Sequence, residues 1–164
     1  MTPELHRPVS LDRIGSLGLD YTVEATPAEC SALADRMKLP EVHALSCAFH
    51  LIREGRDKVL ARGHLRARVT QNCVVSLEDF EAALEETFQV RFVPAGEETE
   101  DVDPEADDEI PFEGNLIDLG EAAAEQLGLA LDPYPRMPGA ELPAAEVDVD
   151  PHPFAGLAGL RRLN

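Results

Sequence analysis

The sequence contains no tryptophan, and only 5% of its 164 residues are aromatic. It also lacks long apolar stretches, since none approaches the roughly 18 residues of a membrane-spanning helix. The first residues show no basic segment followed by an apolar one, which argues against a secretory signal. The three cysteines, with no Cys-x-x-Cys spacing, provide no disulfide framework. These features predict a cytoplasmic protein with reduced thiols.

Basic residues are scarce: 14 Lys and Arg stand against 32 Asp and Glu, for a formal net charge of −18. A charge of this sign repels a phosphate backbone unless basic side chains gather locally. The imbalance lies mainly in the second half of the chain. Residues 1–92 hold 11 basic and 14 acidic side chains, whereas residues 93–164 hold 3 and 18. The first half therefore leaves room for a local basic surface.

The most acidic segment is 97–113, which has ten carboxylates, no Lys or Arg, and two prolines. Such a segment repels itself and cannot bury enough apolar surface to fold alone. Because 44% of the whole chain is apolar, the remainder can still build one core. We therefore expect a single domain over 1–164, with its core in 9–93 and 114–163 and a disordered, flexible acidic loop at 94–113.

Two helices have clear start signals. Thr26-Pro27-Ala28-Glu29 is a capping box with proline at the first helical position, so we expect a helix that ends near Lys38. Asp118 has the same capping chemistry, and a helix after it must end before the prolines that follow Asp132. A third short amphipathic element is predicted at 154–163.

Apolar and polar residues alternate with period two in 42–52, 59–70 and 80–92, which predicts three strands. Because the strands follow one another with short connections, they favour an antiparallel meander. The predicted fold class is thus α+β: an antiparallel β-sheet, open or partly closed into a barrel, with two or three flanking helices and the acidic loop.

No catalytic, nucleotide-binding or metal-binding motif is present. The five histidines are scattered, and none forms an i, i+4 pair. Cys73 has no neighbour in sequence that would activate it, so a buried structural thiol is favoured over a nucleophile. We therefore expect no enzyme activity, no cofactor and no metal.

The predicted strand 59–70 has an apolar face and a basic face. The basic face is formed by Arg62, His64, Arg66 and Arg68. Alternate residues of a strand lie about 6.6 Å apart, close to the spacing of successive phosphates, so these four are candidate nucleic-acid ligands. The alternative is pairing with carboxylates, either Glu81 and Glu85 on the next strand or the acidic loop folded back. The sequence leaves both open.

The acidic segment has its own candidate role, because carboxylates on a tether attract a highly basic partner. It could equally mask the basic strand face until RNA displaces it, or serve only solubility. The candidate partner-binding residues are Glu97, Glu98, Glu100, Asp101, Asp103, Asp107, Asp108 and Glu109.

The order of several short motifs resembles the YceD-like family of large ribosomal RNA subunit accumulation proteins, in its alphaproteobacterial type. The resemblance covers most of the chain and rests on Val69-Thr70-Gln71-Asn72-Cys73, Phe88-x-Val90-x-Phe92, the acidic loop, Ile117-Asp118-Leu119, Leu129-Ala130-Leu131-Asp132-Pro133 and Pro153-Phe154-Ala155-x-Leu157-x-x-Leu160. One departure is clear. Many members carry Cys-x-x-Cys after the first motif, where this chain has Cys73-Val74-Val75-Ser76, so a zinc role does not transfer.

The resemblance implies a non-enzymatic role in accumulation or processing of 23S ribosomal RNA. The expected partners are large-subunit ribosomal RNA, a basic ribosomal protein, or both, with no membrane and no small-molecule substrate. The alternative is an acidic chaperone for a basic large-subunit ribosomal protein that does not touch RNA. Family knowledge supplies no catalytic or binding residues.

Overall fold

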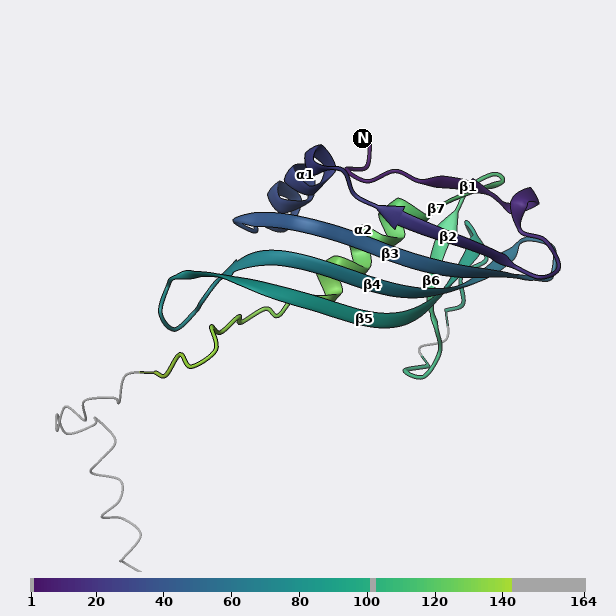
Figure 1. The fold of residues 1–164 in the computed structure, drawn as a ribbon. Helices are drawn as coiled ribbons and strands as arrows, with labels where there is room; N and C mark the ends of the chain where they lie inside the picture. Colours follow the sequence, from purple (N-terminus) through teal and green to yellow (C-terminus); the bar gives the residue numbers. More distant parts are fainter. Residues whose placement is uncertain (1, 101–102, 143–164) are drawn as a thin grey trace, which may run out of the picture.

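The structure, a computed structural model, describes residues 2–100 and 103–142 (Figure 1). Its main element is a five-stranded sheet in the order β2-β3-β4-β5-β6. These strands are β2 (Leu19–Glu24), β3 (Glu41–Glu54), β4 (Lys58–Asn72), β5 (Asp79–Pro94) and β6 (Asp108–Phe112). The order of the first four confirms the predicted meander, which β2 extends by one strand.

A second, two-stranded sheet joins β1 (Pro8–Ser10) to β7 (Leu116–Asp118), so a segment near the start of the chain pairs with one that is distant in the sequence. A short 3-10 helix, η1 (Leu11–Arg13), follows β1. The α-helices are α1 (Pro27–Met37) and α2 (Leu119–Ala130). Neither they nor any other helix of the described residues is long and apolar enough to cross a membrane.

The helices start and end where capping chemistry places them. The Thr26 hydroxyl accepts the Glu29 N–H, and the Glu29 carboxylate accepts the Thr26 N–H, which completes the predicted capping box. α1 then stops at Lys38, whose left-handed conformation (φ 56°) turns the chain toward Pro40. At α2, the Asp118 carboxylate accepts the N–H groups of Gly120 and Glu121. Both predicted starts are confirmed.

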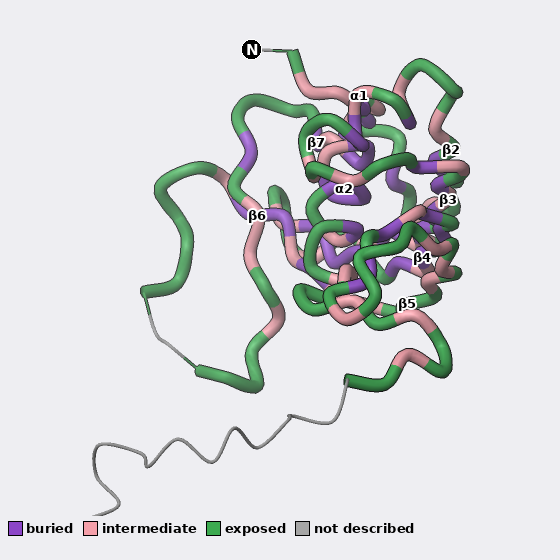
Figure 2. Tube along the Cα trace, turned by 90° about the vertical axis from the view of Figure 1, so that its left-hand side faces the viewer, coloured by how far each residue is buried: buried purple, intermediate pink, exposed green. Residues whose placement is uncertain are grey.

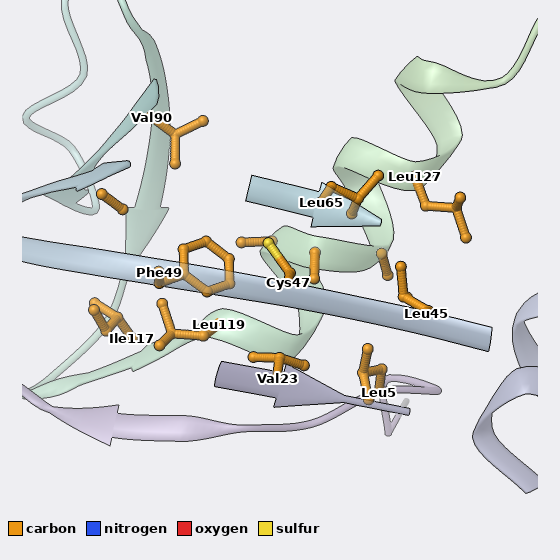
Figure 3. Packing of buried hydrophobic residues seen from close by; sticks show 14 of the residues in the cluster. Leu5, Val23, Leu45, Cys47, Phe49, Leu65, Val90, Ile117, Leu119 and Leu127 are labelled. Carbon is orange, nitrogen blue, oxygen red and sulfur yellow. The ribbon is translucent and has the colours of Figure 1, made fainter. Parts of the chain in front are cut away.

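One face of the sheet is covered and contains the core. Helix α2 and the β1–β7 sheet lie over this face (Figure 2). Side chains from α2, Leu119 and Leu127, meet Cys47 of β3 and Leu65 of β4, and all four are fully buried (Figure 3). The other face carries the alternate residues of β4, and across the middle of the sheet no element of the described chain covers it (Figure 2). We call this the outer face.

A glycine makes room for aromatic packing on the core face. Gly63 lies directly between Phe49 and Phe88 in the register of the sheet. The two rings meet edge to face with their centroids 5.8 Å apart. A Cβ on Gly63 would lie only 2.1 Å from the Phe88 ring, so the absence of a side chain is what allows Phe88 to cover the strand.

Three parts of the predicted fold class need correction. The sheet is not closed into a barrel, because β2 and β6 are its two edges. It is not wholly antiparallel, because β6 runs parallel to β5. Part of the acidic loop has regular structure, since Asp108–Phe112 forms β6. The physical reason is that Ile110 packs against the core and Phe112 is buried, and this apolar burial outweighs the local charge. The predicted element at 154–163 lies outside the described residues.

Candidate functional site on the outer sheet face

The structure places all four predicted basic residues on the outer face. Arg62, His64, Arg66 and Arg68 alternate along β4 with buried residues such as Leu65 and Ala67. The Arg66 and Arg68 side chains are 68% and 58% exposed. The strand thus forms a row of donors facing solvent, which we call the basic row.

Each member of the basic row has a partner on β5. Arg62 Nε donates to Gln89 Oε1 at 3.0 Å. His64 Nε2 lies 2.7 Å from Glu85 Oε1, and Arg66 reaches the same oxygen at 3.3 Å. Arg68 Nη1 lies 3.6 Å from Glu81 Oε1. Of the two pairings with carboxylates that the sequence allowed, the one with Glu81 and Glu85 is present for His64, Arg66 and Arg68.

Glu85 is the central partner because one of its oxygens contacts two members of the basic row. The hydrogen bond from His64 and the positive charge of Arg66 lower the pKa of the Glu85 carboxyl below its ordinary value. Glu85 itself is 61% exposed. Ion pairs at this level of exposure are weak, because water and salt compete with both partners, so a phosphate could replace the carboxylate without large cost.

Two shallow hollows lie side by side on the outer face and border the basic row. One, of about 640 Å³, lies between the start of α1 and β5 and is lined by Arg66, Arg68 and Glu85. The other, of about 680 Å³, lies between β2 and β5 and is lined by Arg62 and His64. On β3 they are bordered by His43 and His50, with the small side chains of Ala44, Ser46 and Ala48 between these two on the outer face. The face is therefore open to a long, shallow ligand.

The wall of these hollows that faces β5 was not predicted from the sequence. That wall is β2, which contributes Asp20 and Thr22 to one hollow and Glu24 to the other. Asp20 Oδ1 lies 2.6 Å from His50 Nδ1 of β3. In β2, the apolar residues Leu19, Tyr21 and Val23 alternate with Asp20, Thr22 and Glu24. This short alternation is the signal that could have placed the three polar side chains on one face.

The acidic segment lies at the other edge of β5 and is partly bound there. Asp107 accepts two hydrogen bonds from Gln89, both at 2.9 Å, and lies 3.3 Å from Arg91. Glu109 accepts the N–H and the hydroxyl of Thr99. Hydrogen bonds from Thr99 lower the Glu109 pKa. Two of the candidate carboxylates therefore stabilise the segment itself.

The other candidate carboxylates of the segment are exposed. They are Glu97, Glu98, Glu100, Asp103 and Asp108, while Asp101 lies outside the described residues. Within the described part of the segment, no carboxylate forms an ion pair with the basic row. The nearest link is indirect, through Gln89, which contacts both Arg62 and Asp107.

Cys73 is buried, as are the other two cysteines. Its sulfur accepts the backbone N–H groups of Met137 and Ser76 at 3.3 and 3.4 Å. These bonds, together with one from the Ser76 hydroxyl, lower the Cys73 pKa to about 7. The bond from Met137 also holds the segment after α2 against the β4–β5 connection, which contains Cys73. Among residues 2–100 and 103–142, no group of three or more His, Cys, Asp or Glu is arranged to hold a metal ion.

These features define an α+β protein with one sheet face covered by a helix and the other face open, charged and lined by small side chains. The sequence matches the family described as large ribosomal RNA subunit accumulation protein YceD over residues 61–161, more than half of the chain. The chain belongs to this family, as the resemblance predicted. The curated proteins contain no significant match to the chain. The solved structures contain none either.

Proposed function

We propose that this protein is a non-catalytic accessory factor that supports accumulation or processing of 23S ribosomal RNA and contacts that RNA through the basic row. Membership of the YceD family supports the role in large-subunit RNA accumulation. The observation that supports the contact is the basic row itself, four donors in one line on the open sheet face. The proposed place of action is the cytoplasm, with ribosomal RNA as the partner.

The charge distribution of the chain favours specific over nonspecific binding of RNA. Glu81 and Glu85 neutralise part of the basic row, and the whole chain carries −18. Nonspecific binding to nucleic acid is almost entirely electrostatic, so both features oppose it. An RNA would still bind if its phosphates replaced the two carboxylates as partners of the basic row and its surface fitted the shallow hollows beside them.

A gel shift of the full chain with large-subunit RNA fragments tests the proposal. The test variant is Arg66→Glu with Arg68→Glu, two exposed side chains whose replacement leaves the core untouched. The matched control is Arg13→Glu with Arg56→Glu, an equal charge change at exposed residues in η1 and in the β3–β4 turn. The proposal expects loss of binding only in the test variant. Equal binding by both variants would remove the basic row from the account.

The second candidate function is binding of a basic large-subunit ribosomal protein, without RNA contact. It is favoured by the exposed carboxylates of the acidic segment before β6. Deleting the whole segment would also remove β6, so the better variant changes Glu97, Glu98, Glu100, Asp101 and Asp103 to Gln or Asn. This variant should lose capture of the basic partner if the second function is right. It should keep or strengthen RNA binding if the first is right.

A further inference from the structure

Among the described residues, the outer face presents no Phe, Tyr or Trp ring, the side chains on which unpaired bases most often stack. Tyr21, Phe49 and Phe88 border the hollow between β2 and β5, but the register aligns all three with Gly63 and so directs their rings to the core face. Phe92 is buried in the core cluster. Phe80 alternates with exposed Glu81 and so shares the side of β5 that holds Phe88. The remaining described aromatics, Phe112 and Tyr134, lie in β6 and after α2. Recognition of single-stranded RNA depends strongly on stacking with such rings, which this face does not offer.

The histidines of the outer face are held in place by neighbouring strands, which contact their ring nitrogens. His50 is bonded to Asp20, His64 to Glu85, and His43 Nε2 lies 2.8 Å from the Thr70 hydroxyl. Each ring therefore has one edge fixed by a cross-strand contact, so a base could stack on it only in the orientation that this contact sets.

What the face offers instead is contact with a sugar–phosphate backbone. The basic row runs from Arg62 to Arg68 of β4, a length of about 20 Å, which spans three to four successive phosphates. The hollows beside it add hydroxyl groups, from Ser46 in one and from Thr22 and Thr87 in the other. A hydroxyl can donate to or accept from a ribose 2′-hydroxyl.

From these observations we infer that the outer face binds the backbone of helical, base-paired RNA rather than unpaired RNA. The A-form helix displays its 2′-hydroxyls and phosphates across a wide, shallow minor groove, which side chains contact largely without reading sequence. This surface matches a shallow protein face with donors in a row and small side chains on its floor. The inference rests on the proposed function and names the class of RNA structure that it requires.

Fluorescence anisotropy with the full chain tests this inference. The probes are a blunt RNA duplex of about 20 base pairs, longer than the roughly 16 that a duplex-RNA domain spans, one of its strands alone, and a DNA duplex of the same sequence. We expect the RNA duplex to bind about tenfold more tightly than the single strand, with little change when its sequence is permuted. The variant Ser46→Ala with Thr87→Val should lose much of the preference for RNA over DNA.

The outcomes separate the inference from the proposed function. Tighter binding of the single strand, or equal binding of RNA and DNA duplexes by the native chain, would overturn the inference and leave ribosomal RNA as the partner. Failure to bind any RNA, large-subunit fragments included, would overturn the proposed function and the inference together. Thr2→Val with Ser16→Ala serves as the control, because it removes two hydroxyls from exposed residues outside the five-stranded sheet.

Discussion

Glu85 should limit RNA affinity, because its carboxylate occupies the position at which a phosphate would meet the basic row. One oxygen of Glu85 lies 2.7 Å from His64 and 3.3 Å from Arg66. Changing Glu85 to Gln keeps the shape and a hydrogen-bond acceptor but removes the negative charge. His64 and Arg66 would then be available to phosphate without first losing an ionic partner.

The expected gain is modest because the contact is exposed. Surface ion pairs contribute little to stability, so releasing one should tighten RNA binding about two- to fivefold at moderate salt. The assay is anisotropy titration of a labelled RNA duplex, repeated at several salt concentrations. The gain should shrink as salt rises, since screening weakens the repulsion between Glu85 and phosphate in the native chain.

Glu86 provides a matched control one residue away. It is exposed, lies opposite Leu65 in the register, and therefore projects from the other face of β5. Glu86→Gln makes the same change in net charge without touching the basic row, so it should alter affinity much less. Equal effects of the two substitutions would show that only total charge matters and would refute the assigned role of Glu85.

Three further predictions concern the framework that holds the site. Gly63→Ala should lower the free energy of unfolding in urea by about 1–3 kcal/mol, because the new Cβ would lie 2.1 Å from the Phe88 ring. Gly15→Ala is the control and should not destabilise the chain, since no atom lies within 4 Å of the position of its Cβ. Gly120→Ala should also lower the free energy of unfolding by about 1–3 kcal/mol, because the new Cβ would lie 2.6 Å from the Leu5 carbonyl oxygen. Alanine is otherwise the better helix former, so a variant more stable than the native chain would contradict that close approach. Hydrogen bonds from Arg7, with further bonds from Thr26, lower the Glu29 pKa from 4.5 to about 2. Its ionised form therefore stabilises the fold above pH 4.5, and this contribution is lost as pH falls toward 2. Glu29→Gln should accordingly cost more stability at neutral pH than at a pH near 2, and an equal cost at both would refute the linkage.

The local pattern of the chain was sufficient to predict the central strands and both helices. In β4, every second residue from Val59 to Val69 is apolar, and this parity alone places Arg66 and Arg68 on the solvent side. The capping residues Thr26 and Asp118 likewise act through neighbouring N–H groups, so their effect is visible in the sequence.

Pairing between distant segments could not be predicted in this way. β6 has only five residues within an acidic stretch, and its parallel alignment with β5 depends on where Phe112 finds apolar contacts. The wall formed by β2 was missed because a six-residue strand gives a weak signal. At the site, the sequence predicted Glu81 and Glu85 as candidate partners of the basic row. That the Glu85 carboxylate contacts both His64 and Arg66 follows only from the cross-strand register.

The most direct test of the central claim is chemical modification of arginine side chains with phenylglyoxal, measured by mass spectrometry of the purified chain with and without large-subunit ribosomal RNA. If the outer sheet face contacts RNA, the RNA should protect Arg62, Arg66 and Arg68 from modification and leave the exposed Arg13 and Arg56 reactive. Bound RNA that protects other arginines and leaves the basic row fully reactive would contradict the account.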